Sequence, residues 1–361
     1  MFAGGGTGGH LFPAIAVADE LRRRHPKASI VFIGGTRGLE TRLVPQAGYP
    51  LRTLSMAGLK GSALAGRLRA AWAAGVAVLR CSGWFLARRP ALVIGVGGYA
   101  SGPAVLAAWL LRVRIMLMEQ NHFPGATNRW LAPRADAVCV PSPAAKQRLR
   151  GIGIVTGNPV RPEFAAIGPS PGAARVALLA FGGSRGARSI NRALVAALPF
   201  LAASTPPLRI VHQTGPEEHG AVASAYAAHP GLDADVRPFL DDMPRRLADA
   251  DLVVCRAGAT TLAELAAAGR PAILVPFPFA SDDHQRANAE AVRDAGAAVV
   301  IEDREMDGPR CAAEILALAA DAPKRRAMAD AAKTLARPDA ASRIADVADA
   351  LLSGTEVARV S

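Results

Sequence analysis

The chain has 361 residues, of which 51% are hydrophobic and 20% charged, and its formal net charge is +12 at pH 7. This length predicts two domains, and the apolar content is enough for two cores. The charge favours acidic partners such as nucleic acid, anionic lipid or a phosphorylated substrate, although a solvated basic surface explains it equally well. The scattered cysteines, without a CxxC pair, exclude a disulfide framework and a zinc site and fit a reducing cytosol.

Short apolar runs alternate with amphipathic segments along the whole chain. The first half has expected strands at 29–33, 91–95, 115–118 and 135–140, and the second half at 176–181, 208–212, 252–255, 272–275 and 297–301. Helical patterns include 12–24, 39–47, 62–89 and 338–352. This alternation predicts an α/β protein with doubly wound parallel sheets, whose ligands bind at the carboxyl ends of the strands.

Two glycine loops follow predicted strands, at 4–9 and 182–186, one in each half of the chain. Only Met1–Ala3 precede the first loop, so the strand that leads into it is expected to be short. A glycine loop between a strand and a helix exposes N–H groups at a positive helix end, which suits phosphate. We therefore expect two nucleotide-fold domains across a cleft, residues 1–158 and 159–337, with the C-terminal helix 338–361 packing back on the first.

In the first half, polar loops follow three of the predicted strands and are expected to converge. His10 ends the first glycine loop, the second loop is 97–103, and Glu119-Gln120-Asn121 follows strand 115–118. An unperturbed imidazole titrates near about pH 6.5, which suits a general base, and Glu119 is the second candidate. The strand at 29–33 does not end in the acidic residue that a nicotinamide or flavin site needs, so that class is disfavoured.

In the second half, the loop and helix start at 258–264 follow a predicted strand. Thr260 and Thr261 suit helix capping, and Glu264 suits either a cap or the hydroxyls of a ribose. The loop 276–288 offers candidate sugar ligands, namely Asp282, Asp283, His284, Gln285 and Asn288. The pairs Asp249/Asp251 and Asp233/Asp235 match an Asp-x-Asp metal motif, but both are expected before a strand, at the wrong edge of the sheet, so no metal is predicted.

Taken in order, these motifs resemble one family, the bacterial peptidoglycan N-acetylglucosaminyltransferases that convert lipid I to lipid II. The resemblance covers nearly the whole chain; the matching stretches are 4–10, 12–13, 97–103, 119–121, 127–128, 157–161, 182–187, 239–243, 255–269 and 276–288. It implies a GT-B architecture with the acceptor in the N-terminal half and the donor in the C-terminal half. It also implies inverting transfer from UDP-N-acetylglucosamine (UDP-GlcNAc) to undecaprenyl-pyrophosphoryl-N-acetylmuramoyl pentapeptide (lipid I), without a cofactor.

The family's site positions carry over to this sequence residue by residue. In the first half, the resemblance implies donor contacts at Thr7, Gly8, Gly9 and Asn121, and acceptor contacts at Tyr99 and Asn128. In the second half, it implies uracil contacts at Arg161 and Leu240, a diphosphate contact at Ser184, a ribose contact at Glu264 and a sugar contact at Gln285. The phosphate-binding helix start corresponds to Ala259, Thr260, Thr261, Leu262 and Ala263. His284 departs from the pattern, because a second glutamine is expected there.

The segment 59–89 combines apolar residues at helical spacing with six cations and no acidic residue. An interfacial helix has such a composition, so we expect binding to anionic lipids. The resemblance, with its polyprenyl-lipid acceptor, implies a peripheral location on the cytoplasmic face of the inner membrane. The contact residues are expected to be Trp72, Leu79, Arg80, Trp84, Phe85, Arg88 and Arg89. In the alternative interpretation, the apolar face packs on the sheet and the arginines are solvated.

Two other functions remain open from the residues alone. A non-hydrolysing UDP-sugar epimerase of the same fold would need acidic groups on both sides of the donor sugar and no lipid-binding face. A basic nucleic-acid-binding α/β protein would explain the charge of +12. The sequence has no recognisable RNA- or DNA-binding motif, so we expect no nucleic-acid partner.

Overall fold

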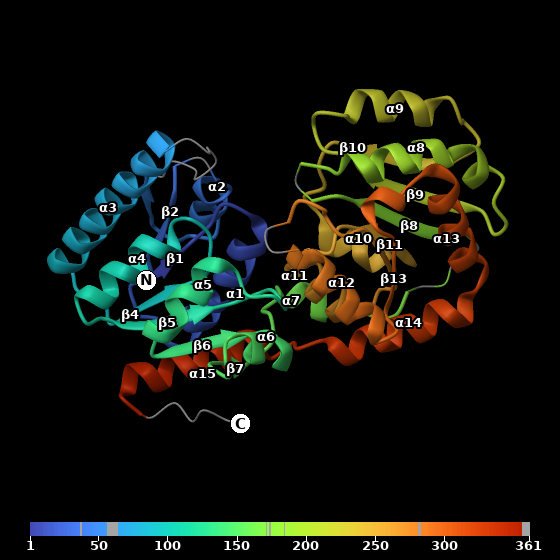
Figure 1. Cartoon of the computed structure of the whole chain (residues 1–361). Coiled ribbons are helices and arrows are strands. Elements are labelled where there is room, and N and C mark those ends of the chain that lie inside the picture. The colour runs from blue at the N-terminus through green and yellow to red at the C-terminus, as the bar shows by residue number, and fades with distance from the viewer. Residues whose placement is uncertain are drawn as a thin grey trace. The chain divides into compact units, whose positions relative to one another are not determined.

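The computed structural model describes residues 1–36, 38–55, 64–170, 172, 175–183, 185–280 and 283–355, with the side chains of 64–70 left out. The chain divides into two compact units. Unit 1 is Met1–Arg161 with Arg337–Ser361, and unit 2 is Pro162–Ala336. Each unit is built on its own parallel sheet, with helices packed against it (Figure 1). The doubly wound α/β architecture expected from the alternating pattern is confirmed.

Unit 1 contains a seven-stranded sheet in the order β3-β2-β1-β4-β5-β6-β7. The strand bounds are β1 Phe2–Ala3, β2 Phe32–Gly35, β3 Leu51–Leu54, β4 Leu92–Gly95, β5 Arg114–Met118, β6 Ala137–Val140 and β7 Ile154–Val155. The helices are α1 Gly8–Arg24, α2 Glu40–Gln46, α3 Leu64–Ala87, α4 Ser101–Leu110, α5 Ala126–Leu131, η1 Ala132–Arg134, α6 Pro143–Arg148 and α15 Ala340–Ser353. The strand order reverses between β1 and β4, and this switch point is where doubly wound sheets bind ligands.

Unit 2 repeats this plan with six strands in the order β10-β9-β8-β11-β12-β13. The strand bounds are β8 Val176–Phe181, β9 Leu208–Gln213, β10 Asp233–Arg237, β11 Leu252–Cys255, β12 Ala272–Leu274 and β13 Ala298–Val300. The helices are α7 Pro162–Ala165, α8 Arg188–Ala202, α9 His219–Ala227, α10 Met243–Asp249, α11 Ala259–Ala268, α12 His284–Asp294, η3 Asp303–Glu305, α13 Gly308–Ala320 and α14 Ala322–Leu335. The switch point lies between β8 and β11.

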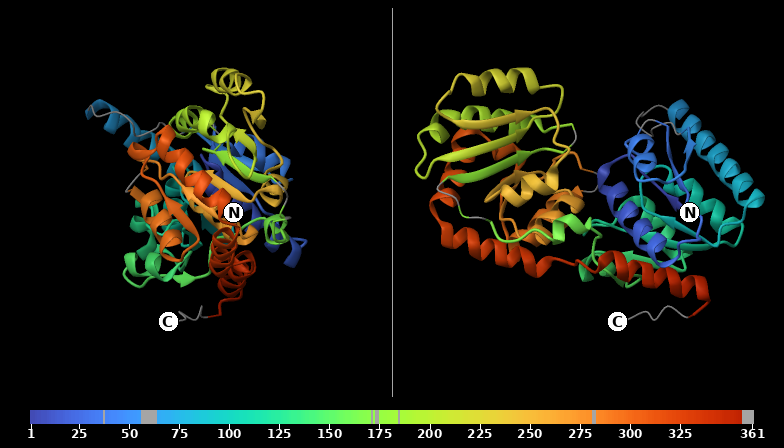
Figure 2. Two further views of the ribbon diagram at one scale, coloured as in Figure 1. Left: turned by 90° about the vertical axis from the view of Figure 1, so that its right-hand side faces the viewer. Right: turned by 180° about the vertical axis from the view of Figure 1, so that it is seen from behind.

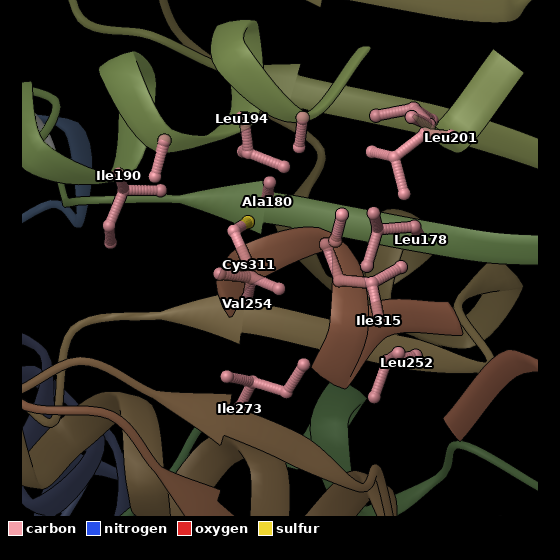
Figure 3. Close-up of a cluster of buried hydrophobic side chains, with 14 of the residues drawn as sticks. Leu178, Ala180, Ile190, Leu194, Leu201, Leu252, Val254, Ile273, Cys311 and Ile315 are labelled. Carbon is pink, nitrogen blue, oxygen red and sulfur yellow. The ribbon is translucent and has the colours of Figure 1, made fainter. Parts of the chain in front are cut away.

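The central strands are apolar on both faces because helices cover both sides. In β5, Met116 and Met118 pack with residues of α1 and α15, while Ile115 and Leu117 pack with residues of α3 and α4. Alternate strand residues point to opposite faces, so a continuous apolar run is what a doubly covered strand requires. In unit 2, strand residues such as Leu178 and Val254 meet Leu194 of α8 and Ile315 of α13 in one core (Figure 3).

The C-terminal helix α15 belongs to unit 1, where it packs along α1 (Figure 2). Its buried residues, among them Ile344 and Ala348, join the same core as the apolar face of α1. Arg24 fixes the pair at the surface, because its guanidinium donates to Asp346 at 2.6 Å and to Asp349 at 2.9 Å. The last helical segment therefore completes a face of the first sheet.

Strands β3 and β7 were missed, and β10 begins at Asp233 rather than after Asp235 as expected. Strands β3 and β10 lie at sheet edges and carry polar residues, and β7 has only two residues, so none of them gives a buried apolar run. Asp233 and Asp235 lie within β10 rather than before a strand, where they pair with Arg175, Arg237 and Arg246. Asp251 does precede β11, as expected, and its carboxylate accepts a hydrogen bond from Ala177 N at 2.8 Å.

Helix α3 covers one face of the unit 1 sheet, which corrects one expected membrane contact. Phe85 is 1% exposed and packs with Cys81 and Ala77 in the core on that face. It therefore cannot touch a lipid surface. Its neighbour Leu86 points the other way and is 71% exposed.

This orientation predicts different costs for two adjacent truncations. Phe85→Ala removes a buried ring and should lower the free energy of unfolding by about 3–5 kcal/mol. Leu86→Ala should change it by less than about 0.5 kcal/mol, because that side chain is already in solvent. Urea unfolding followed by circular dichroism measures both. Equal costs for the two variants would show that the assigned inner face of α3 is wrong.

Candidate functional site

Two loops meet at the carboxyl edge of the unit 1 sheet with no side chain between them. The loop after β1 contains Gly4 and Gly5, and the loop after β4 contains Gly97 and Gly98. A Cβ added to Gly4 would lie 2.4 Å from the Gly97 carbonyl oxygen, and one added to Gly98 would lie 2.5 Å from that of Gly5. Both positions also have positive φ angles, +148° and +78°. Only glycine allows this close approach, so the two predicted loops are brought together by their composition.

Glu40 holds the first loop in place, and the sequence analysis missed it. Its buried carboxylate accepts hydrogen bonds from Gly6 N at 2.9 Å and from Gly35 N at 2.7 Å, which joins the loops after β1 and β2. A Cβ on Gly5 or Gly34 would approach the Glu40 side chain to 2.8 or 2.6 Å. The signal was the run of glycines just before a lone glutamate, because N–H groups without side chains readily enclose a carboxylate.

His10 lies in the first turn of α1 and faces the loop after β5. Its Nδ1 is 2.9 Å from Oε1 of Gln120, and a Cβ on Gly97 would lie 3.1 Å from its Cε1. The expected convergence of the loops 4–9, 97–103 and 119–121 around His10 is therefore present in the structure. Gln120 is the partner of His10, a role that the sequence analysis did not assign.

Glu119 is buried and surrounded by N–H donors. Its Oε1 accepts from the backbone N of Gln120 and from N and Nδ2 of Asn121, at 2.9 to 3.1 Å. Its Oε2 accepts from Gly125 N and Asn128 Nδ2, both at 2.9 Å. Both oxygens of this side chain accept hydrogen bonds from N–H groups, which suits a structural anchor better than a proton acceptor. The described hydrogen bond of the His10 ring is at Nδ1, whereas both carboxylate oxygens of Glu119 accept hydrogen bonds.

The other expected positions of unit 1 differ in how accessible they are. Tyr99 is exposed, and so is Thr7, which precedes α1 without a side-chain capping bond. Arg161 is partly buried with its guanidinium 5.1 Å from the Phe12 ring centroid, and Gly8 and Gly9 begin α1. Asn128, expected to touch the acceptor, is instead buried and donates to Met118 O and Glu119, so its direct contribution is to the anchor.

In unit 2, the backbone of the glycine loop after β8 packs closely against the backbone that follows β9. A Cβ on Gly186 would lie 1.9 Å from Thr214 O, and one on Gly215 would lie 2.1 Å from Arg185 O. Gln213 adds a side-chain bridge: its Nε2 donates to Gly183 O at 2.8 Å, and its Oε1 accepts from Leu240 N at 2.9 Å. The glycine loop and Leu240 are therefore fixed to each other. Ser184 lies outside the described residues.

Helix α11 begins at the carboxyl end of β11, next to the switch point. Its N-cap is Gly258, which has no side chain, so the expected capping by Thr260 or Thr261 is not what starts this helix. The first-turn N–H groups of Ala259 to Leu262 lie at the positive end of the helix dipole, a position that favours an anion. Glu264 lies in the second turn of α11 and is partly exposed. Burial raises the pKa of Cys255, and the carboxylate of Glu264 raises it further. This interaction places Glu264 beside Cys255, the last residue of β11.

The loop after β12 is held by side chains from the same edge. Gln285 Oε1 accepts from Phe277 N at 3.0 Å, and Asn288 donates to Ala257 O at 3.2 Å. Arg256, which the sequence analysis missed, donates to Val275 O and Pro276 O at 3.1 Å and pairs with Asp303 at 2.5 Å. Its position directly after β11 was the available signal. Asp282 lies outside the described residues.

The remaining expected membrane contacts lie on α3 and on the two residues that follow it. Trp72 and Leu79 are 73% and 74% exposed, and Arg80, Arg88 and Arg89 are exposed as well. Trp84 is partly buried, and the guanidinium carbons of Arg52 and Arg80 lie 5.3 and 5.4 Å from its ring centroid. Lys60 and the side chains of Arg67 and Arg69 lie outside the described residues. Among the described helices, none is long and apolar enough to cross a bilayer.

Within the described part of the chain, no group of three or more His, Cys, Asp or Glu side chains is arranged to hold a metal ion. At the carboxyl edges of the two sheets, the described groups that favour an anion are N–H groups at helix N-termini and in glycine loops.

Family models match both halves of the chain. The N-terminal domain of glycosyltransferase family 28 matches residues 1–140, and its C-terminal domain matches residues 177–344. The UDP-N-acetylglucosamine--N-acetylmuramyl-(pentapeptide) pyrophosphoryl-undecaprenol N-acetylglucosamine transferase of Anaeromyxobacter sp. (strain Fw109-5) is 46% identical over 350 residues, covering 96% of this chain and 92% of the relative. The chain belongs to this transferase family. The namesake from Myxococcus xanthus is 42% identical, covering 96% of this chain and 91% of that protein.

Solved structures agree with this membership. The chain matches the crystal structure of Acinetobacter baumannii MurG with a TM-score of 0.78 and 31% identity, over 96% of this chain and 98% of that one. A putative UDP-N-acetylglucosamine 2-epimerase from Listeria monocytogenes has a TM-score of 0.70 at 17% identity, over 95% and 94% of the two chains. That likeness shows a shared fold only. The resemblance inferred from the motifs is confirmed, and so is the GT-B fold.

The environment of Glu119 generates a test of its role. Glu119→Gln replaces one acceptor oxygen by an NH2 group that must face N–H donors, so we expect a loss of at least about 2 kcal/mol of unfolding free energy. Asp346→Asn, at a side chain that is 64% exposed in unit 1, should cost less than about 1 kcal/mol. Thermal and urea unfolding measure both. A Glu119→Gln protein with wild-type stability but no turnover would transfer the role of base to Glu119.

Proposed function

We propose that this chain transfers N-acetylglucosamine from UDP-GlcNAc to undecaprenyl-pyrophosphoryl-N-acetylmuramoyl pentapeptide, forming lipid II for peptidoglycan synthesis. The observation that carries the proposal is the 46% identity to a transferase named for this reaction, along 96% of the chain. The reaction needs a base for the acceptor hydroxyl and positive potential for the leaving diphosphate. A histidine at the edge of the first sheet and N–H groups at the edge of the second can supply them. We assign the acceptor to residues 1–158 and the donor to residues 159–337.

The reaction is an inverting displacement. The acceptor hydroxyl oxygen forms a bond to the anomeric carbon of N-acetylglucosamine while the bond from that carbon to the diphosphate oxygen breaks, giving a β-1,4 linkage. The hydroxyl proton goes to His10, and the bonding electron pair leaves with UDP. Of the two base candidates, we choose His10, because the carboxylate of Glu119 is occupied by at least five N–H donors. We assign Glu119 to positioning of the loop that carries Gln120.

The departing diphosphate needs positive potential, which the start of α11 and the second glycine loop supply through N–H groups. We assign Ala259, Thr260, Thr261, Leu262 and Ala263 to this helix start and Ser184 to the glycine loop. Glu264 accepts from the ribose hydroxyls, Leu240 and Arg161 lie on the uracil side, and Gln285 contacts the sugar. Unit 1 adds donor contacts from Thr7, Gly8, Gly9 and Asn121, and an acceptor contact from Tyr99.

Neither of the alternative functions is favoured. The 2-epimerase similarity is limited to 17% identity, whereas the transferases reach 46%. The nucleic-acid alternative depends on the overall charge alone. The nucleic-acid alternative would be supported if random DNA bound in a salt-dependent way and displaced UDP-GlcNAc.

We also propose that the outward face of α3 binds anionic lipids of the cytoplasmic leaflet. The acceptor is a polyprenyl lipid, so the unit that receives it must reach the bilayer surface. The exposed apolar residues Trp72, Val76, Leu79 and Leu86 follow one another at helical spacing on this face, and Arg80 and Arg88 lie beside them. An apolar stripe flanked by cations is what an interfacial helix presents to an anionic bilayer. The protein is then a peripheral membrane enzyme.

The direct test of the activity is an assay of purified protein with radiolabelled UDP-GlcNAc and a lipid I analogue. We expect label in a lipid product from which mild acid hydrolysis of the glycosyl diphosphate releases a labelled disaccharide, and from that disaccharide a β-N-acetylglucosaminidase should release labelled N-acetylglucosamine. Label converted to UDP-N-acetylmannosamine without an acceptor would instead indicate an epimerase, and would refute the proposal.

The ribose assignment predicts a specific loss of affinity. Glu264→Ala should weaken UDP binding roughly 10- to 100-fold, because it removes charge-assisted hydrogen bonds worth about 1.5–3 kcal/mol. The unfolding temperature should change little. Glu290→Ala, on α12 of the same unit, is the control and should bind UDP as the wild type does. Calorimetric titration decides the question, and an unchanged affinity of Glu264→Ala would remove this residue from the donor site.

The lipid proposal predicts binding that requires both apolar and basic groups on α3. Sedimentation with vesicles should rise with anionic lipid content and fall with salt. The double variant Trp72→Ala/Leu79→Ala and the variant Arg80→Glu/Arg88→Glu should each sediment less. The matched unit 2 controls are Phe200→Ala, an exposed apolar residue, and Arg304→Glu, an exposed cation. Equal binding of all these proteins, or equal binding to neutral and anionic vesicles, would contradict the proposal.

A further inference from the structure

The hydrogen bonds of Gln120 define which nitrogen of His10 is free. Gln120 is 3% exposed, and its side-chain amide has two polar neighbours. Its Nε2 donates to Met118 O at 3.3 Å, and its Oε1 lies 2.9 Å from His10 Nδ1. The amide thus connects a backbone carbonyl at the end of β5 to the imidazole in the first turn of α1.

The orientation of this amide follows from its carbonyl neighbour. If the amide were reversed, its oxygen would face Met118 O, and two acceptors would meet without a proton between them. Met118 O already accepts a second hydrogen bond, from Asn128 Nδ2 at 3.1 Å, which confirms it as an acceptor. The amide oxygen therefore faces His10. Because a carbonyl oxygen only accepts, His10 must donate from Nδ1.

We infer that Gln120 is a positioning residue that holds the proton of neutral His10 on Nδ1 and leaves the lone pair of Nε2 as the basic atom. The inference about the tautomer stands on the hydrogen bonds alone, while its meaning for turnover rests on the proposed function. In the proposed step, Nε2 receives the proton of the acceptor hydroxyl, and Nδ1 keeps its hydrogen bond to Gln120 throughout.

The surroundings keep both partners in place. Glu119 accepts from the backbone N of Gln120 at 3.0 Å, so the anchor described above also fixes the start of this side chain. A Cβ added to Gly97 would lie 3.1 Å from Cε1 of His10, tighter than an ordinary van der Waals contact, so the glycine leaves room for the ring beside this loop. The imidazole is thus confined between a backbone loop and a fixed amide.

The partner of the imidazole is neutral, although the loops around it carry ionisable groups. Glu119 faces N–H donors, Glu40 is bonded to Gly6 and Gly35, and Tyr99 is exposed on the loop after β4. His122, on the loop after β5, bonds to Ser142, and burial, with a contribution from Arg148, lowers the pKa of His122. The described hydrogen bonds bring none of these groups to His10. A neutral amide orients the base without stabilising its protonated form as a carboxylate would.

The tautomer is measured first, without any assay of turnover. Two-bond proton–nitrogen correlation spectra of protein labelled with ¹⁵N-histidine should show His10 with a protonated Nδ1 and an unprotonated Nε2 above its titration. His10→Ala identifies the signals by their loss. In Gln120→Leu the fixed Nδ1–H form should be lost. A wild-type protein with the proton on Nε2 overturns the inference, whatever the enzyme's activity.

Kinetics then test positioning. Gln120→Leu should lower kcat about 10- to 100-fold, as losses of partners that orient a functional imidazole do, with KM for UDP-GlcNAc within about two-fold of wild type. Gln120→Glu should move the rising limb of the kcat profile to higher pH, because a carboxylate favours the protonated imidazole and the base must be unprotonated. Gln46→Leu and Gln46→Glu, on the exposed side of α2, are the matched controls.

The outcomes separate this inference from the proposed function. A wild-type pH profile in Gln120→Glu, or an unchanged kcat in Gln120→Leu, would overturn the positioning role. If His10 has the expected tautomer and His10→Ala keeps turnover within a few-fold of wild type, the base assignment fails while the Gln120 hydrogen bond stands. Should Gln120→Leu fold poorly, as thermal unfolding would reveal, the wild-type tautomer and Gln120→Glu still decide the question.

Discussion

The carboxylate of Glu119 is the interaction on which the functional edge of unit 1 depends. A buried carboxylate is costly unless donors replace its water, and here at least five N–H hydrogen bonds do so. Those donors belong to one short loop and to α5, so the bonds fold the chain after β5 around a single charge. The loop geometry then places Gln120 beside His10. The chemistry proposed for His10 thus depends on a charge that never needs to touch the substrate.

In unit 2, neutral and cationic side chains position the loops at the carboxyl edge of the sheet. Gln213 joins the glycine loop to Leu240, and Arg256 joins the ends of β11 and β12 to Asp303. Arg256 also donates to Ser189 in α8 at 2.9 Å. In a parallel sheet, successive loops at one edge are connected only through the strands beneath them, so side-chain bridges of this kind set their relative positions. Both units therefore position flexible, glycine-rich segments by polar residues at strand ends.

The sequence was sufficient for the architecture because apolar runs and glycine loops are local signals. Strands such as β8 and β11 were predicted with their observed bounds, since four to six consecutive apolar residues leave little choice. The start of the edge strand β10 was misplaced, because its exposed polar residues give no such pattern. Likewise, the face of α3 that contains Phe85 could not be chosen from its sequence, as apolar residues lie on both sides of that helix. The roles of Glu40, Gln120, Gln213 and Arg256 were not predicted, because each of these side chains bonds to a residue that is distant in the sequence.

The two sheets share a topology but use their N–H groups differently. In unit 1, the N–H groups of the loops after β1 and β5 already have anionic partners within the chain, since Glu40 and Glu119 accept from them. In unit 2, α11 starts at a glycine that brings no side chain to its N-terminus. A helix end of this kind attracts an external anion. The same fold thus uses its N–H groups in two ways: in unit 1 the chain's own carboxylates accept from the loop N–H groups, and in unit 2 we propose that the start of α11 receives an external diphosphate.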